Sequence, residues 1–455
     1  MTPEEFRTYG YAAIDWIAHY LENSREYPVL PKVEPGSLID VLPKQGPEAG
    51  EDFAEILADF EEQIVPRNTQ WNHPRFMGYF AISGAPPGII AELLCAALNS
   101  NGMLWKSSPA ATELEQVTLG WLRDWMGLPA DWFGQILDTA SVSTFHAIVA
   151  ARVRKGHKSA DESLTFYTSE FAHSSVPKAA YSAGIARENV RLIGADEEFR
   201  MRPSLLEQAI EADIAAGKAP FCVVATVGTT SVTSIDPVRE VAAIARKYGL
   251  WLHIDGAYGA SAAVSEKHRW ILDGVEEADS LVVNPHKWLL TPVDLSVLYC
   301  KNAEWLREAF SLAPEYLRTK QDPRALNFHE YGLPLGRRFR SLKLWFTMRA
   351  YGRRGIASMI DEHIENAKRL RDLIVADGNW EIVAPVEFSL VVFRHKEGDE
   401  KTKAVLERVN DSGRALISPD VLRGKQAIRL AIGNWQTRWE DVEAAWAAVQ
   451  EAAAQ

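Results

Sequence analysis

The chain has 455 residues, of which 47% are apolar and 10% aromatic, so it is long and apolar enough to build more than one packed unit. Its formal net charge of −12 argues against a nucleic-acid partner, because binding to a phosphate backbone depends on clustered Lys and Arg. The three cysteines lie far apart, the N-terminus carries no secretory signal and no apolar run is long enough to span a bilayer. We therefore expect a cytoplasmic protein with reduced thiols and no membrane contact.

Two amphipathic helices are predicted near the N-terminus. Thr2, Pro3 and Glu5 are typical of a helix start, and aromatic residues follow at helical spacing. A second helix begins near Phe53 and stops at Pro66, after an extended connection rich in Pro and Gly. Two helices on such a connection cannot form a core alone, so they must pack on the rest of their own chain or on another subunit.

From about residue 140 to residue 300 strand-like and helix-like segments alternate. Apolar runs predict strands at 164–167, 190–193, 221–227, 250–254, 280–283 and 295–300. Apolar residues at helical spacing predict helices at 143–154, 176–182, 204–215 and 238–248. This alternation predicts an α/β fold with a mostly parallel central sheet, covered on both faces, and with ligand groups at the carboxyl ends of its strands.

The order of elements changes beyond residue 345. A long helix at 355–376 precedes two further helices and strands at 380–383, 390–393, 416–418 and 427–431, which together predict a small C-terminal α+β domain. We therefore divide the chain into an N-terminal helical segment at 1–80, a large α/β domain at 81–345 and a small α+β domain at 346–455.

A lone lysine follows the buried run 281–283, in the segment Asn284-Pro285-His286-Lys287-Trp288. An amine attacks a carbonyl carbon only when it is partly deprotonated, and burial and neighbouring cations favour the neutral form. The strand at 250–254 ends in Asp255, a position that faces the ligand crevice of a parallel sheet. Pyridoxal phosphate needs a lysine for its aldehyde carbon and an acid for its pyridine nitrogen. Either residue alone is more often a solvated strand end or a turn cap, but together they predict a site for this cofactor.

Four segments carry a resemblance to a known family: 284–288, 253–258 (His-Ile-Asp-Gly-Ala-Tyr), 172–175 (Ala-His-Ser-Ser) and 335–343 (Leu-Gly-Arg-Arg-Phe-Arg-Ser-Leu-Lys). They resemble the motifs of the group II pyridoxal-phosphate decarboxylases, nearest to the aromatic-L-amino-acid decarboxylase group. The similarity runs in register from about Trp71 to the helix after Trp345. It implies a fold-type I enzyme that uses pyridoxal 5'-phosphate and forms a homodimer with shared active sites, in which the N-terminal helices embrace the second subunit.

The resemblance also implies roles for the residues around the cofactor. Lys287 would carry it covalently, Asp255 would pair with the pyridine nitrogen and His173 would stack on the ring. The other implied contacts are Ala140, Ser141 and Asn284 at the phosphate, Thr230 near the cofactor or the substrate carboxylate, Ala257 beneath the ring and His286 beside Lys287. Backbone N–H groups at a helix start suit a phosphate, although Ser and Thr before a helix are also ordinary caps.

Tyr316 matches the family's mobile-loop tyrosine, which returns a proton to Cα after CO2 has left. Relatives that form aldehydes carry Phe at this position, so Tyr316 favours decarboxylation of tryptophan, tyrosine, phenylalanine or a close analogue to the arylalkylamine. Two alternatives on the same fold stay open, an aromatic aldehyde synthase and an acidic amino-acid decarboxylase. A homologue without catalytic activity is disfavoured by the intact set of Lys287, Asp255, His173 and Tyr316.

The resemblance implies that Trp71, Phe80, Met103 and Gly336 line the pocket for the substrate ring, some of them from the second subunit. Glycine at position 336 is associated with indole-accepting plant relatives. Two residues depart from the mammalian pattern, since Ile82 replaces a hydroxyl residue and Asn101 replaces an aliphatic one. A missing hydroxyl at Ile82 weakens the case for a catechol, because a buried phenol needs a hydrogen-bond partner. Asn101 could supply a partner elsewhere, so the preferred aromatic side chain stays open.

Overall fold

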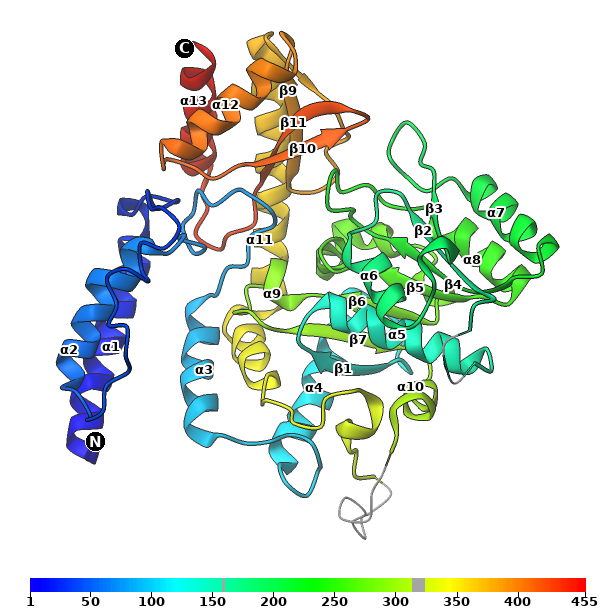
Figure 1. The fold of residues 1–455 in the computed structure, drawn as a ribbon, viewed down its shortest axis with the longest axis horizontal. Coiled ribbons are helices and arrows are strands. Elements are labelled where there is room, and N and C mark those ends of the chain that lie inside the picture. Colours follow the sequence, from blue (N-terminus) through cyan, green and yellow to red (C-terminus); the bar gives the residue numbers. More distant parts are fainter. Residues whose placement is uncertain (158, 160, 313–323) are drawn as a thin grey trace.

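A seven-stranded sheet forms the centre of the structure, a computed structural model that describes residues 1–157, 159, 161–312 and 324–455 (Figure 1). The strands follow the order β1-β7-β6-β5-β4-β2-β3. All neighbours are parallel except β7, which is antiparallel to both β6 and β1. The strands are β1 (Phe133–Leu137), β2 (Leu164–Ser169), β3 (Val190–Ile193), β4 (Ala219–Thr226), β5 (Trp251–Asp255), β6 (Ser280–Val283) and β7 (Ser296–Cys300). The predicted α/β fold with a mostly parallel sheet is confirmed.

Helices cover both faces of this sheet. One face packs on α5 (Ala140–Arg154), α6 (Ser175–Ser182) and α10 (Ala303–Phe310). The other packs on α4 (Pro109–Met126), α7 (Pro203–Ala215), α8 (Val238–Tyr248) and the first half of α11 (Ser341–Asp377). Because apolar helices lie on both sides, strands such as β5 are buried along their whole length.

The long helix α11 connects this large layer to the small domain (Figure 1). It is bent at Gly352, whose φ of 63° is left-handed, so it consists of two helices that meet at a kink. The second half contributes to one apolar core with α12 (Asp399–Asp411), α13 (Trp439–Ala453) and an antiparallel sheet of order β10-β11-β9-β8. The strands of this sheet are β8 (Trp380–Ile382), β9 (Leu390–His395), β10 (Ser418–Leu422) and β11 (Lys425–Ala431). The proposed boundary after residue 345 therefore falls inside a helix.

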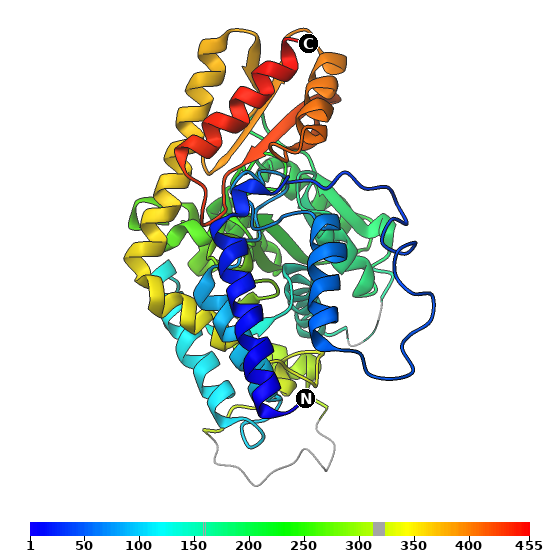
Figure 2. The same cartoon turned by 90° about the vertical axis from the view of Figure 1, so that its left-hand side faces the viewer.

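The N-terminal arm consists of α1 (Pro3–Glu22) and α2 (Phe53–Asp59), which lie side by side on the outside of the molecule (Figure 2). Thr2 and Glu5 form the predicted capping box. Rings join the two helices, with centroids 5.0 Å apart for Tyr9 and Phe53 and 4.9 Å apart for Trp16 and Phe60. No residue of α1, which lies within the described part of the chain, is buried. The next helix, α3 (Pro86–Leu98), also leaves apolar side chains exposed.

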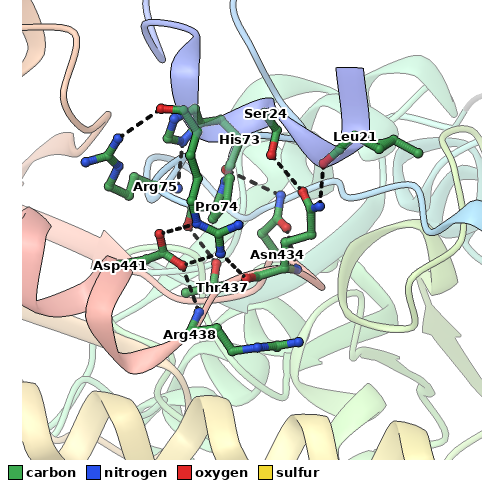
Figure 3. A network of polar contacts seen from close by, with 11 residues as sticks. Leu21, Ser24, His73, Pro74, Arg75, Asn434, Thr437, Arg438 and Asp441 are labelled. Atoms are coloured by element: carbon green, nitrogen blue, oxygen red, sulfur yellow. Dashed lines mark hydrogen bonds and ion pairs between the residues drawn. The ribbon is translucent and has the colours of Figure 1, made fainter. Parts of the chain in front are cut away.

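A polar network ties the end of the arm to the start of α13 (Trp439–Ala453) and the segment before it (Figure 3). The Arg25 guanidinium donates to both Asp441 carboxylate oxygens, at 3.0 and 2.8 Å. The Ser24 hydroxyl donates to Gln436 Oε1 at 3.0 Å, and Gln436 Nε2 donates to the Leu21 carbonyl at 2.8 Å. Residues more than 400 positions apart in the chain are therefore in direct contact.

The described helices include none with the length and hydropathy required to cross a bilayer.

Candidate active site

Lys287 lies on a single helical turn, α9 (Pro285–Trp288), directly after β6. Pro285 fixes the first position of this turn, and Trp288 anchors its end in the core. The Trp288 ring is fully buried, stacks on Tyr258 with centroids 4.6 Å apart, and donates from Nε1 to His363 Nδ1 at 3.0 Å. The lysine is therefore held by a rigid neighbour at the carboxyl end of the sheet.

A cavity of about 200 Å³ opens beside Lys287 at the ends of β4, β5 and β6. All nine predicted cofactor residues line it: Ala140, Ser141, His173, Thr230, Asp255, Ala257, Asn284, His286 and Lys287. Its other lining residues are Phe80, Thr139, Ser175, Thr226, Gly228 and Tyr258. Segments far apart in sequence thus converge on one site, as expected where parallel strands end together.

The charges in the cavity act on Lys287 in opposite directions. Burial lowers the pKa of the Lys287 amine below its usual value, and the positive charge of Arg429 lowers it further, whereas the Asp255 carboxylate raises it. Burial dominates, so the neutral, nucleophilic form of the amine is favoured. Asp255 is itself buried and accepts a hydrogen bond from the Ala257 backbone N–H at 3.1 Å, which fixes one of its oxygens.

Hydrogen bonds orient both histidines of the cavity. His173 Nδ1 accepts from the Ser175 backbone N–H at 3.2 Å and lies 2.7 Å from the Ser175 hydroxyl, so the proton of the neutral ring is on Nε2. His286 Nδ1 accepts from the Leu295 N–H at 2.9 Å, which fixes its tautomer in the same way. Burial, with help from Lys287 and Lys343, lowers the pKa of His286 to about 4. His286 is therefore neutral at physiological pH.

One end of the cavity offers hydrogen-bond donors to an anion. Ala140 and Ser141 are the first two residues of α5, where backbone N–H groups have no partner within the helix and the helix dipole is positive. The Asn284 side chain is buried against the same cavity, and its Oδ1 has no hydrogen-bond partner among the described residues. An amide in this position can turn its NH2 group towards a phosphate oxygen. These features fit a phosphate at this end of the cavity.

Two stacked aromatic residues form one wall of the cavity. The Phe80 ring stacks on Tyr258 with centroids 3.9 Å apart, and Lys287 Nζ lies 5.5 Å from the Phe80 centroid. Of the predicted substrate residues, only Phe80 is in this cavity.

The other predicted substrate residues lie elsewhere, as far as the described lining shows. Trp71 packs on Phe76, with centroids 4.2 Å apart. Ile82 is half-buried, and the Met103 carbonyl accepts from the His329 N–H at 3.2 Å. Exposed Asn101 and Gly336 are brought together because Asn101 Oδ1 accepts from the Arg337 N–H at 2.9 Å. This bond uses one acceptor site of the Asn101 amide, the group predicted as a possible partner for a phenol. Tyr316 lies outside the described residues.

Five lining residues were not predicted. Ser175 belongs to a segment singled out in the sequence, and Thr139, Thr226, Gly228 and Tyr258 each adjoin a predicted residue or strand end. Arg429, which acts on Lys287 from β11, had no such signal. The described His, Cys, Asp and Glu residues form no group of three or more that could hold a metal ion.

A family model described as "Pyridoxal-dependent decarboxylase conserved domain" matches residues 35–396. The chain belongs to the pyridoxal-dependent decarboxylases. Aromatic-L-amino-acid decarboxylase of Bos taurus is 39% identical to it, over 100% of this chain and 97% of the relative. Phenylacetaldehyde synthase of Arabidopsis thaliana is 38% identical, over 100% and 96%. A crystal structure of Oryza sativa TDC with PLP and tryptamine superposes with a TM-score of 0.96 at 33% identity, covering 100% of this chain and 98% of the other.

The family assignment and the fold-type I architecture predicted from the sequence are thereby confirmed, and this decarboxylase is a carboxy-lyase whose cofactor is pyridoxal 5'-phosphate. The cavity suits that group on its own chemistry, because it joins an anion-binding helix start, a buried carboxylate and a lysine whose charged form is disfavoured.

Proposed function

We propose that this decarboxylase converts an aromatic L-amino acid, namely tryptophan, tyrosine, phenylalanine or a close analogue, to the corresponding arylalkylamine and CO2. The observation that carries the proposal is the position of Lys287 beside Asp255, against the Phe80–Tyr258 aromatic wall. Relatives that match the whole length of the chain are named as decarboxylases of aromatic amino acids, which supports the same substrate class here.

The residues of this chain would divide the work as follows. Lys287 would hold the cofactor covalently, Ala140, Ser141 and Asn284 its phosphate, and Asp255 the protonated pyridine nitrogen. The bound cofactor supplies an electron sink for the pair released when the Cα–carboxylate bond breaks. The neutral rings of His173 and His286 would fix the cofactor and Lys287 without adding charge. Exclusion of water by the aromatic wall favours loss of a charged carboxylate as neutral CO2.

A proton must then return to the substrate Cα, and we assign its delivery to Tyr316. Aldehyde formation is the second candidate, because phenylacetaldehyde synthase is as similar to this chain as several decarboxylases are. The tyrosine at position 316 favours decarboxylation. An acidic amino-acid substrate is disfavoured, since the described lining of the cavity has no arginine to bind a side-chain carboxylate.

We also propose that the active form is a homodimer. Exposed apolar side chains on α3 include Ile90 (49%), Leu93 (52%) and Leu98 (60%), and exposed Asn101 and Gly336 adjoin the end of that helix. A second copy packed on this face would bring ring-binding residues to its neighbour's cavity and would cover the unburied arm. We assign the protein to the cytoplasm, where buried thiols such as Cys222 stay reduced.

The first test is product analysis. Purified protein with added pyridoxal phosphate is incubated with tryptophan, tyrosine, phenylalanine, dihydroxyphenylalanine and glutamate, and products are separated by mass. We expect one or more arylalkylamines with stoichiometric CO2. Aldehyde with ammonia and peroxide would instead assign the synthase reaction, and an amine from glutamate alone would overturn the aromatic substrate class.

The Tyr316→Phe variant tests the proton donor. Without the phenol, the electron pair left at Cα reacts with oxygen, so aldehyde should replace most of the amine. The ratio of aldehyde to amine, measured beside consumption of dissolved oxygen, reports this change. An unchanged amine yield would show that a different group delivers the proton.

A further inference from the structure

Arg429 is a buried arginine of the small domain that contacts backbone at the border of the large-domain cavity without lining the cavity itself. It lies on β11 and is 4% exposed. Its Nε donates to the Ser231 carbonyl at 3.1 Å, and its Nη2 donates to the carbonyls of Thr230 and, at 3.4 Å, Tyr79. Its nearest described counter-charge is Asp420, at 3.7 Å. The guanidinium therefore donates its hydrogen bonds to backbone carbonyls that border the cavity.

One of these contacts supports a backbone conformation that is unfavourable on its own. Tyr79 has a φ of 51°, in the left-handed region that non-glycine residues seldom adopt. Its N–H donates to Ser418 Oγ at 2.7 Å, and its carbonyl accepts from Arg429. Both partners belong to the β10–β11 hairpin. The small domain thus holds Tyr79 in the turn that sets Phe80 against Tyr258.

Arg429 also places a positive charge at the same aromatic wall as Lys287. Its guanidinium carbon lies 5.3 Å from the Phe80 centroid, and Lys287 Nζ lies 5.5 Å from that centroid. Because the Phe80 ring that both cations contact is 6% exposed, water screens their interaction weakly. Burial is the main cause of the lowered pKa of the Lys287 amine, and repulsion by Arg429 lowers this pKa further.

We propose that Arg429 is a positioning residue of the active site, which fixes the Thr230 and Phe80 walls from the small domain and keeps a positive charge beside Lys287. The inference rests on the proposed function where it concerns turnover. The effect of the Arg429 charge on the Lys287 amine does not depend on any substrate. A residue that only joined the two domains would affect stability and leave the chemistry of Lys287 unchanged.

The test compares three full-length variants. Arg429→Gln removes the charge, Arg429→Lys keeps the charge but loses the planar fork of donors, and Arg394→Gln removes an arginine from the neighbouring strand β9. Arg394 pairs with Glu381 on β8, whereas Arg429 donates to the backbone of Tyr79, Thr230 and Ser231 beside the cavity, so Arg394→Gln is the matched control.

The first readout needs no turnover. Apo-protein is mixed with pyridoxal phosphate and borohydride from pH 6 to pH 10, and modification of Lys287 is quantified by mass spectrometry, with Lys287→Ala as the blank. We expect the pH midpoint of modification to rise by about one unit in Arg429→Gln and to stay near the wild-type value in Arg429→Lys and Arg394→Gln. A wild-type midpoint in Arg429→Gln overturns the charge role.

The second readout is steady-state kinetics with the amino acid that the product panel selects. We expect kcat to fall about 10- to 100-fold in Arg429→Lys, because a misplaced wall disturbs the reacting geometry, and to stay unchanged in Arg394→Gln. Loss of thermal stability at unchanged kcat would leave Arg429 a domain link only and overturn the proposal.

A further variant covers the case in which Arg429→Gln does not fold. Ser418→Ala loosens the same Tyr79 turn without removing the charge, so kcat should fall while the modification midpoint stays at the wild-type value. Unchanged kcat there, together with unchanged kcat in Arg429→Lys, overturns the positioning role. If wild-type protein releases no amine from any substrate, the proposed function fails, whereas the midpoint still decides the charge role.

Discussion

The surroundings of Lys287 disfavour the charged form of its amine, and the next residue, Trp288, holds it in place. Burial and Arg429 lower the pKa of its amine, and the Trp288 ring next to it cannot move without breaking a fully buried stack. The residue is therefore both reactive and positioned. We expect Lys287→Ala to abolish turnover and borohydride-trapped cofactor while the thermal midpoint changes little, because the side chain contributes no core packing. Turnover in this variant would remove Lys287 from the centre of the mechanism.

Ala257 limits the space beneath the predicted cofactor ring. It is 8% exposed and lines the cavity between Asp255 and Tyr258. Two added methyl groups should obstruct the ring, so we expect Ala257→Val to weaken cofactor binding by about 10- to 100-fold, equivalent to the roughly 1–3 kcal/mol of overpacking. Fluorescence titration of apo-protein with pyridoxal phosphate measures the change. Ala212→Val, at an exposed position on α7, is the control that should bind the cofactor normally.

Individual site residues could be predicted from the sequence where they belong to a short local motif. The nine predicted cofactor residues come from short segments next to strand ends, and the sheet topology brings such ends together. Their contacts with the cofactor stay predictions. Arg429 could not be found in this way, because its relation to the cavity depends on how the β10–β11 hairpin packs on the large domain. The role predicted for exposed Asn101 and Gly336 likewise depends on the second copy of the proposed homodimer.

Helices and strands have the predicted bounds where the spacing of apolar residues and the length of the segment both indicate the same type of element. The strands β3 and β6 and the helix α8 begin and end as predicted. In contrast, β1 was missed, because Phe-Gly-Gln-Ile-Leu has no alternation and only sheet pairing with β7 makes it a strand. The strand predicted at 416–418 is β10 at 418–422 instead, since Pro419 and Asp420 disfavour a strand yet are tolerated at the edge of a sheet.

A close approach of two glycines joins the loops that follow β4 and β5. A Cβ on Gly259 would lie 2.4 Å from the Val227 carbonyl oxygen, and Gly228 has a φ of 87° directly opposite. We expect Gly259→Ala to push these loops apart, lowering the free energy of unfolding by about 1–3 kcal/mol and weakening cofactor binding at least tenfold. Urea unfolding and cofactor titration measure the two effects.

The matched control is Gly120→Ala in α4. A Cβ there meets nothing within 4 Å, and alanine favours a helix interior, so this variant should be more stable by about 0.5–1 kcal/mol. Equal behaviour of the two variants would contradict the close-approach argument.

Across the whole molecule, buried histidines make stability depend on pH. Burial lowers the pKa of His73, His146, His253, His286 and His363 to about 4. In the unfolded chain a histidine titrates near 6.5, so between pH 6.5 and pH 4 the unfolded state binds more protons than the folded state. The stabilisation is complete above pH 6.5 and is lost as the pH falls towards 4.

We therefore expect the free energy of unfolding to fall steeply from pH 6.5 to pH 5, at most about 2 kcal/mol per histidine at pH 5. In His363→Gln the slope between pH 5 and pH 6 should correspond to about one proton fewer, as urea unfolding at several pH values can measure. Ala212→Val, at an exposed position on α7, removes no titratable group and should keep the wild-type slope. The same slope in both variants would contradict this explanation.

The partners of the Arg25–Asp441 network are synthesised at very different times. Its partners are separated by 416 positions, and a ribosome adds about 5–20 residues per second, so the arm emerges roughly 20–80 s before the segment that anchors it. Throughout that interval the nascent chain carries the aromatic helix pair α1–α2 without its anchor at Gln436 and Asp441. If the proposed homodimer forms through this arm, the arm of one nascent chain is available to its neighbour on the same messenger RNA before either polypeptide is complete.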